Sequence, residues 1–284
     1  MIELLMKPKR AERHPGEMFF IGMFWASVSL LMVSFVFSND SVLKDASGIL
    51  VVLITVLCCL PFMYYIIKLE EGKDMQINDS GKLIWEHYKA IKALMWLFLG
   101  VVIAFSFFYL IIPDKAPQNF NFQIKTYCAI NNPSNYGYCL ENNDVQPSTG
   151  KAIGSDAVLN IFANNISVLI FTIVFSLLFG AGAIFILVWN ASVISAAIGI
   201  FAKGSLEQLP LGVLRYMIHG VPEIAAYFVG ALGGGIISVA VIRRDLRGEG
   251  IWRILQDSLI LIIIAIVILF ISAFMEAYLT PLLF

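Results

Sequence analysis

Residues 161–202 read IFANNISVLIFTIVFSLLFGAGAIFILVWNASVISAAIGIFA and contain no Asp, Glu, Lys or Arg. A helix needs about 20 mainly apolar residues to cross the roughly 30 Å of hydrocarbon in a bilayer. The stretch holds two such runs, 161–180 and 183–202, and the small residues Gly180-Ala181-Gly182 between them predict a tight turn. We therefore expect two membrane spans joined as a helical hairpin.

Similar apolar runs recur on both sides of this hairpin. Hydrophobic residues make up 59% of the chain and charged residues only 14%, whereas soluble domains carry about a quarter charged residues. The net charge of −1 offers no basic surface for nucleic acid, so the expected partner is the lipid bilayer and not a nucleic acid. The sequence predicts an all-α, polytopic transmembrane helical bundle of about seven spans. These spans are 18–37, 48–67, 93–112, 161–180, 183–202, 221–242 and 259–279.

The basic residues predict the orientation of the bundle. The run 18–37 follows a basic leader and is too long for a signal-peptide core, so we expect it to be retained. With the N-terminus in the cytoplasm, 13 of the 19 Lys and Arg residues lie in inner segments, as the positive-inside rule requires. We expect a multi-pass protein of the plasma membrane of a bacterium or archaeon, with the N-terminus inside and the C-terminus outside.

The predicted spans divide the chain into three parts. Residues 1–112 form a three-span module with a basic leader, 113–156 an extracytoplasmic loop, and 157–284 a four-span module. A cytoplasmic loop, 68–92, carries the turn signal Asn78-Asp79-Ser80-Gly81 between alternating segments, which predicts a short β-hairpin.

The four cysteines occupy two settings. Cys128 and Cys139 lie in the predicted outer loop, where oxidising conditions favour a disulfide between them. Two free thiols remain the alternative if the orientation is inverted. Cys58 and Cys59 lie inside the second span and are expected to be inert apolar fillers.

Polar side chains within the spans identify a candidate site, because they cost free energy in hydrocarbon. Two asparagines open the fourth span, a glutamate opens the sixth, and a second glutamate closes the seventh. These positions share one membrane depth in either orientation, and a third asparagine lies deeper. An arginine and a histidine precede the sixth span. The candidate residues are Asn164, Asn165, Asn190, Arg215, His219, Glu223 and Glu276.

The start of the sixth span, Met217 to Glu223, contains a helix-breaking signal. Pro222 cannot donate to the carbonyl of Ile218, and Gly220 tolerates unusual backbone angles. We expect the helix to restart here with Pro222 in its first turn. The preceding residues 210–217 are then a short amphipathic segment that lies along the outer interface or re-enters the membrane.

Two interpretations of this polar set stay open. Glu223 is either a helix cap beside a structural His219, or part of an ion, proton or ligand site with Glu276. An ion pair with Arg215 would be a structural way to neutralise a buried acid. One histidine without a thiolate does not suit zinc, and carboxylates with amide oxygens suit a hard cation better, so the metal is left undefined.

Small residues recur at every fourth position of the sixth span, at Ala226, Gly230, Gly234 and Ser238. Such a stripe allows another helix to approach closely. The partner is either a neighbouring helix of the same chain or the same stripe in a homodimer. We find no nucleotide-binding loop, metalloprotease motif or nucleophile elbow, so we expect neither enzymatic activity nor a cofactor.

Several short motifs of the C-terminal part resemble the stage II sporulation protein M family of integral membrane proteins. They cover about 120 residues from Asn160 onward and consist of Asn164-Asn165, Trp189-Asn190, His219-Gly220-Val221-Pro222-Glu223 and Glu276-Ala277-Tyr278-Leu279-Thr280-Pro281. The first three spans and the loop 113–156 match less well. The resemblance implies a membrane scaffold or remodelling protein that holds cell-envelope partners and performs no catalysis itself. A channel or transporter that binds its solute at the polar set is the alternative.

Overall fold

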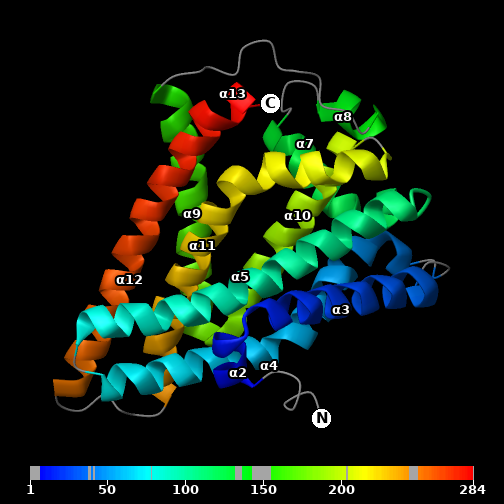
Figure 1. Ribbon diagram of the computed structural model, residues 1–284. Coiled ribbons are helices and arrows are strands. Elements are labelled where there is room, and N and C mark those ends of the chain that lie inside the picture. The colour runs from blue at the N-terminus through cyan, green and yellow to red at the C-terminus, as the bar shows by residue number, and fades with distance from the viewer. Residues whose placement is uncertain are drawn as a thin grey trace.

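The computed structural model describes residues 7–37, 40, 42–77, 79–131, 136–142, 155–202, 204–242 and 249–283. In these residues the secondary structure is helical, without a strand, and seven helices are long and apolar enough to cross a membrane (Figure 1). The predicted all-α, seven-span bundle is therefore confirmed. Two parts of the predicted outer loop, 132–135 and 143–154, lie outside the described residues.

Three long helices form the N-terminal part. The elements in order are α2 (Pro8–Arg13), α3 (Gly16–Met32), the π-helical turn η1 (Val33–Phe37), the 3₁₀ turn η2 (Leu43–Ala46), α4 (Ser47–Gln76) and α5 (Ser80–Ile111). The backbones of α3 and α5 touch at two glycines: a Cβ on Gly22 would lie 2.1 Å from the Leu97 oxygen, and one on Gly100 2.0 Å from the Phe19 oxygen. Only glycine permits this approach.

The β-hairpin predicted within 68–92 is wrong. α4 continues to Gln76, and α5 begins three residues after Ile77. The Asp79 carboxylate caps α5 by accepting the backbone N–H groups of Gly81 and Lys82 at 2.9 and 3.2 Å. The residues read as a β-turn are thus a helix N-cap, a role for which Asp is equally suited.

Three short helices cover the end of the bundle opposite α2 (Figure 1). They are α6 (Ala116–Asn119), α7 (Asn121–Asn131) and α8 (Tyr136–Asn142). The expected disulfide between Cys128 and Cys139 ties α7 to α8, with the Cα atoms 5.8 Å apart. The Tyr127 hydroxyl bonds that of Tyr216 at 2.8 Å, which joins α7 to the C-terminal part. Cys58 and Cys59 are free thiols within α4.

The C-terminal part contains four long helices. Its elements are α9 (Ser155–Phe179), the 3₁₀ turn η4 (Ala181–Ala183), α10 (Ile184–Ala202), the 3₁₀ turn η5 (Leu206–Gln208), α11 (Leu209–Ile242), α12 (Glu249–Phe274), the π-helical turn η6 (Met275–Leu279) and α13 (Thr280–Leu283). The expected tight turn is present, with Gly180 at φ 60°. The two helices diverge from it, however: α9 packs mainly on α11, and α10 mainly on α5.

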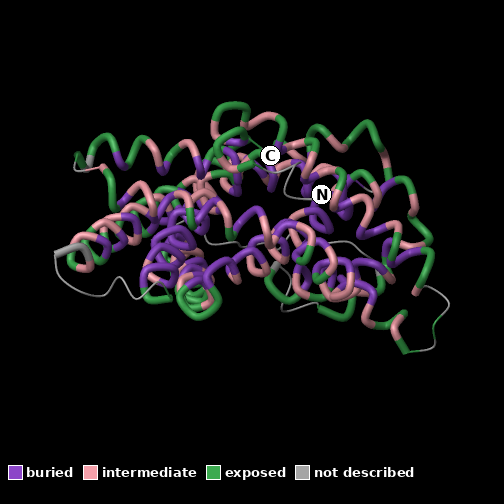
Figure 2. The backbone as a smooth tube through the Cα atoms, turned by 90° about the horizontal axis from the view of Figure 1, so that it is seen from below, coloured by how far each residue is buried: buried purple, intermediate pink, exposed green. Residues whose placement is uncertain are grey.

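α11 lies at the centre of the bundle and is a single helix. The restart predicted at Pro222 is wrong, because the helix runs through the proline from Leu209 to Ile242. Figure 1 shows α11 bending where its colour passes from yellow to gold, so the chain accommodates the missing N–H by a bend. In Figure 2 the buried residues gather along the interior of the molecule and the exposed ones along its outside.

Glycines let three helices approach α11. A Cβ on Gly234 would lie 2.9 Å from the Ile173 oxygen of α9, and one on Gly233 3.1 Å from the Ser258 oxygen of α12. A Cβ on Gly235 would lie 2.8 Å from the Ile67 side chain of α4. Of the predicted small-residue stripe, Gly234 thus packs closely against α9 of the same chain.

We predict that Gly100→Ala destabilises the bundle, because its new methyl group would meet the Phe19 backbone oxygen and force α3 away from α5. Overpacking of this kind costs about 1–3 kcal/mol, sometimes more. Thermal unfolding of the purified protein in detergent measures the loss. Gly72→Ala is the matched control, since nothing lies within 4 Å of its Cβ and alanine favours the helix. Equal unfolding midpoints for the two variants would contradict the close contact.

Candidate functional site

Side chains from four elements meet at the end of the bundle where α11 faces the C-terminus. The Tyr227 hydroxyl donates to Glu223 Oε1 at 2.9 Å, and the Ser272 hydroxyl donates to the His219 carbonyl at 2.8 Å. His219 Nδ1 lies 3.1 Å from the Thr280 hydroxyl. We call this group the outer polar cluster; it consists of His219, Glu223, Tyr227, Ser272, Glu276 and Thr280.

The two glutamates of the outer polar cluster face each other. Ser272 and Thr280 lie one turn on either side of Glu276, and both contact His219. His219 lies one turn before Glu223 on α11, so both carboxylates occupy the same interface. Glu223 and Glu276 interact electrostatically and are half-buried. Two carboxyl groups therefore share this interface, and the Tyr227 hydroxyl donates a hydrogen bond to one of them, Glu223.

The asparagine pair approaches this cluster from α9. Asn165 is buried, its Oδ1 accepts from Asn164 Nδ2 at 3.3 Å, and its own Nδ2 has no hydrogen-bond partner among the described residues. Leu169 of α9 lies against Gly230. Asn165 lies four residues before Leu169, and Ala226 lies four residues before Gly230, so Asn165 is level with Ala226. Ala226 stands between Glu223 and Tyr227 along α11. A hydrogen bond from an asparagine to a glutamate of the cluster stays a prediction.

Two residues of the predicted set make other contacts. Asn190 donates to the Ile186 carbonyl of its own helix at 2.8 Å. The Arg215 guanidinium lies over the Phe201 ring, 5.1 Å from its centroid. Neither of these two contacts involves a residue of the outer polar cluster, which contains His219, Glu223 and Glu276 of the predicted set.

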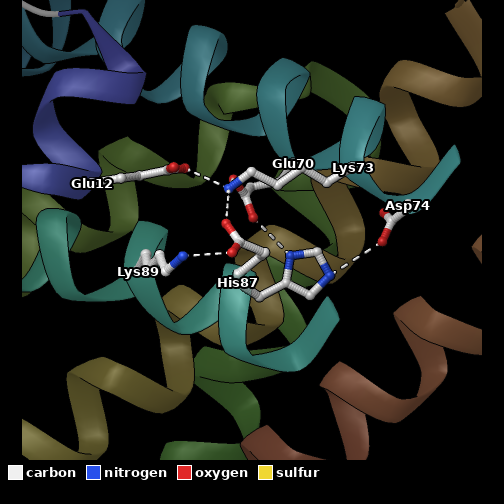
Figure 3. Close-up of polar contacts among 7 residues, drawn as sticks. Glu12, Glu70, Lys73, Asp74, His87 and Lys89 are labelled. Atoms are coloured by element: carbon white, nitrogen blue, oxygen red, sulfur yellow. Dashed lines mark hydrogen bonds and ion pairs between the residues drawn. The ribbon is translucent and has the colours of Figure 1, made fainter. Parts of the chain in front are cut away.

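A second polar group, which the sequence did not reveal as a site, lies at the other end of the bundle (Figure 3). We call it the inner charge cluster. It joins α2, the end of α4 and the start of α5, and consists of Glu12, Glu70, Lys73, Asp74, Glu86, His87 and Lys89.

His87 connects two buried carboxylates of α4. Its Nδ1 lies 2.9 Å from Glu70 Oε2 and its Nε2 3.2 Å from Asp74 Oδ1, as Figure 3 shows. The side chains of both acids are 0% exposed and that of His87 only 3%. A carboxylate within 3.2 Å of each ring nitrogen favours the protonated imidazole. The ring therefore acts as a cationic clamp between α4 and α5.

Lys73 is the second cation of the inner charge cluster. Its Nζ lies 2.8 Å from Glu12 Oε1, 2.7 Å from Glu70 Oε1 and 3.3 Å from Glu86 Oε2. Burial and the neighbouring Glu70 raise the pKa of Glu12 to about 7, and Lys73 only partly offsets that rise. The contact fastens α2 to the bundle. Among the described residues no group of three or more His, Cys, Asp or Glu side chains is placed to hold a metal ion.

One sequence signal could have revealed the inner charge cluster. Glu70 and Asp74 of α4 are four positions apart with Lys73 between them, and Glu86 and Lys89 of α5 are three apart, as on one face of a helix that continues beyond the membrane. Assigning 68–92 to a loop concealed that spacing. The pairing across the two helices is a tertiary contact.

We predict that His87→Gln lowers the free energy of unfolding by about 3–5 kcal/mol, because it removes the cation beside buried Asp74 and leaves Glu70 with Lys73 alone. Thermal or denaturant unfolding of the purified protein measures the change. Lys89→Gln is the control; it removes a cation from the more exposed Glu86 pair, and such pairs contribute at most about 1 kcal/mol. The clamp is refuted if both variants lose the same stability.

The outer polar cluster generates a different prediction. Glu223→Gln keeps an acceptor for Tyr227 and removes a charge facing Glu276, so we expect unchanged or higher stability. Tyr227→Phe removes the donor to a partly buried carboxylate and should cost about 1–3 kcal/mol. Unfolding midpoints at neutral pH distinguish the two variants, and a larger loss for Glu223→Gln than for Tyr227→Phe would contradict the arrangement.

Comparison with known proteins places this geometry in a family context. The family model described as Stage II sporulation protein M matches residues 7–281. An uncharacterized protein of Methanocaldococcus jannaschii is 30% identical over 131 residues, which cover 43% of this chain and 70% of that protein. No solved structure matches the chain. The match extends the resemblance found in the C-terminal part over the first three spans as well.

Proposed function

Because the chain belongs to the stage II sporulation protein M family, we propose that it is a membrane scaffold that holds cell-envelope proteins at fixed positions. It would do so in the plasma membrane, with the N-terminus in the cytoplasm and the C-terminus outside. The orientation rests on the distribution of Lys and Arg residues. In this proposal the chain has no catalytic activity.

The packing at the centre of the bundle supports a scaffold rather than a conduit. A small hollow lies where α4, α5, α10 and α11 meet, and every side chain around it is apolar. These side chains belong to Cys59, Leu97, Phe98, Val101, Ile184, Leu187, Val188, Ala191 and Phe228. A solute path would need polar side chains or water at this depth. The two polar clusters lie at opposite ends, and the apolar layer between them separates them.

The short helices α6–α8, which cover one end of the bundle, also support the scaffold proposal because they form a fixed surface. The disulfide and the bond between Tyr127 and Tyr216 fix them to α11, so they present a defined surface. Tyr136 and Tyr138 of α8 are 37% and 41% exposed. Exposed tyrosines on a rigid support suit protein recognition. We propose this surface as the place where an envelope partner binds.

A flux assay and a cross-linking assay test the proposal together. We expect proteoliposomes with the protein to leak Na⁺, K⁺, Cl⁻ and protons no faster than empty vesicles or vesicles with Glu223→Gln. Pro117→Cys introduces a thiol on α6. Its labelling by an impermeant thiol reagent reports the orientation of the protein in cells and in vesicles. Flux that Glu223→Gln abolishes would replace the scaffold by a transporter.

The cross-linking assay places photo-reactive residues in the protein in its native host. One at Tyr138 should give a discrete adduct with an envelope protein, and one at Tyr136 should give the same adduct. The control position is Phe171 on α9, which is 60% exposed and faces lipid in the proposed arrangement. No common adduct from the two tyrosine positions, or the same adduct from Phe171, would overturn the binding surface.

A further inference from the structure

A stripe along α5 combines basic and aromatic side chains on the surface. Trp85, Tyr88 and Trp96 are 60%, 49% and 38% exposed. Lys82 and Lys92 are exposed as well. These positions advance by three or four residues and therefore lie along one side of the helix. We call them the basic-aromatic stripe.

The opposite side of the same segment is packed into the protein. Leu83 and His87 are 2% and 3% exposed, and His87 faces the buried acids of α4. Trp85 and Tyr88 instead stack on each other at the surface, with ring centroids 5.3 Å apart. The stripe is thus a fixed outward face of a helix that the inner charge cluster holds in place.

The length of α5 places this stripe at a membrane boundary. The helix has 32 residues and is about 48 Å long, whereas the hydrocarbon layer is about 30 Å thick. Trp96 lies beside Phe19 of α3, and the neighbouring Phe20 and Phe24 are 65% and 56% exposed. The stripe therefore starts on the lipid-facing surface and continues past it, at the depth where Trp and Tyr are enriched in membrane proteins.

Acidic groups nearby are engaged elsewhere. Glu86 contacts Lys73 and Lys89, and Glu70 contacts His87 and Lys73. Lys82 and Lys92 are instead exposed, on the same side of α5 as the exposed aromatic residues. Basic side chains next to a span attract the phosphates of anionic lipids.

We propose that the basic-aromatic stripe binds anionic phospholipid headgroups in the leaflet that it faces. Lys82 and Lys92 contact the phosphate groups, and the rings of Trp85 and Tyr88 lie at the level of the glycerol. The inference is independent of the scaffold proposal, because it uses only the surface of α5.

Fluorescence quenching by brominated lipids tests the binding. The signal of Trp85 is the difference between the wild type and Trp85→Phe, measured in mixed micelles that contain brominated phosphatidylglycerol or brominated phosphatidylcholine. We expect half-maximal quenching of this signal at a roughly 25-fold lower mole fraction of the anionic lipid. Each lysine contributes a factor of about five, so Lys82→Gln with Lys92→Gln should abolish the preference.

The controls separate a specific surface from overall charge. Lys44→Gln with Lys125→Gln removes the same charge at the other end of the bundle and should keep the preference. Excess inorganic phosphate should leave it unchanged, since the proposed ligand is a headgroup in a membrane. Circular dichroism confirms that each variant is folded. Equal quenching by both lipids, an equal loss in the control pair, or competition by inorganic phosphate would each overturn the proposal.

Discussion

Hydrocarbon contains no water to satisfy a polar group, and this constraint arranges the whole molecule. Charged side chains are excluded from the middle of the spans and gather at the two ends. In the middle, the helices approach through glycines and through buried serines that donate to a neighbouring backbone, as Ser176 does to Ala231 and Ser195 to Val102. Gly100 brings α5 onto α3, and three consecutive glycines, Gly233 to Gly235, bring α12, α9 and α4 onto α11. Because α11 contacts a neighbour on several sides, it becomes the buried axis of the bundle.

The two polar ends solve the problem of burying acids in different ways. In the inner charge cluster, cations compensate the acids: His87 lies between Glu70 and Asp74, and Lys73 contacts three carboxylates. Removing one cation would leave its buried carboxylates uncompensated and destabilise the fold. The inner charge cluster therefore acts as a clamp between the helices. In the outer polar cluster, two carboxylates face each other with hydroxyl groups and a histidine around them. Glu276 lies in a π-helical turn, an irregularity that often occurs at functional positions.

The sequence predicted what composition and short-range chemistry determine. Apolar runs predicted the seven spans, and two cysteines in one polar loop predicted the disulfide. Both wrong predictions came from local signals that have two meanings. Asp79 suits a β-turn and a helix N-cap equally, and Pro222 breaks an isolated helix but only bends one whose neighbours hold it on all sides. The inner charge cluster escaped prediction because it depends on which turn of α4 faces which turn of α5, and no window along one helix contains that information.

The apolar centre connects the two polar ends of the bundle. The first half of α11 contacts α7 through Tyr216, and the second half lies among α4, α9 and α12. A partner on α7 and α8 would therefore be held at a fixed distance from the clamp at the other end. The clamp in turn fixes α5 and the lysines of the basic-aromatic stripe. If the disulfide between Cys128 and Cys139 is reduced, α8 loses its tie to α7 while the apolar centre keeps all its contacts. Rigid packing between the two membrane faces is what the proposed scaffold role requires, and this bundle packs through glycine seams in the middle and ion pairs at one end.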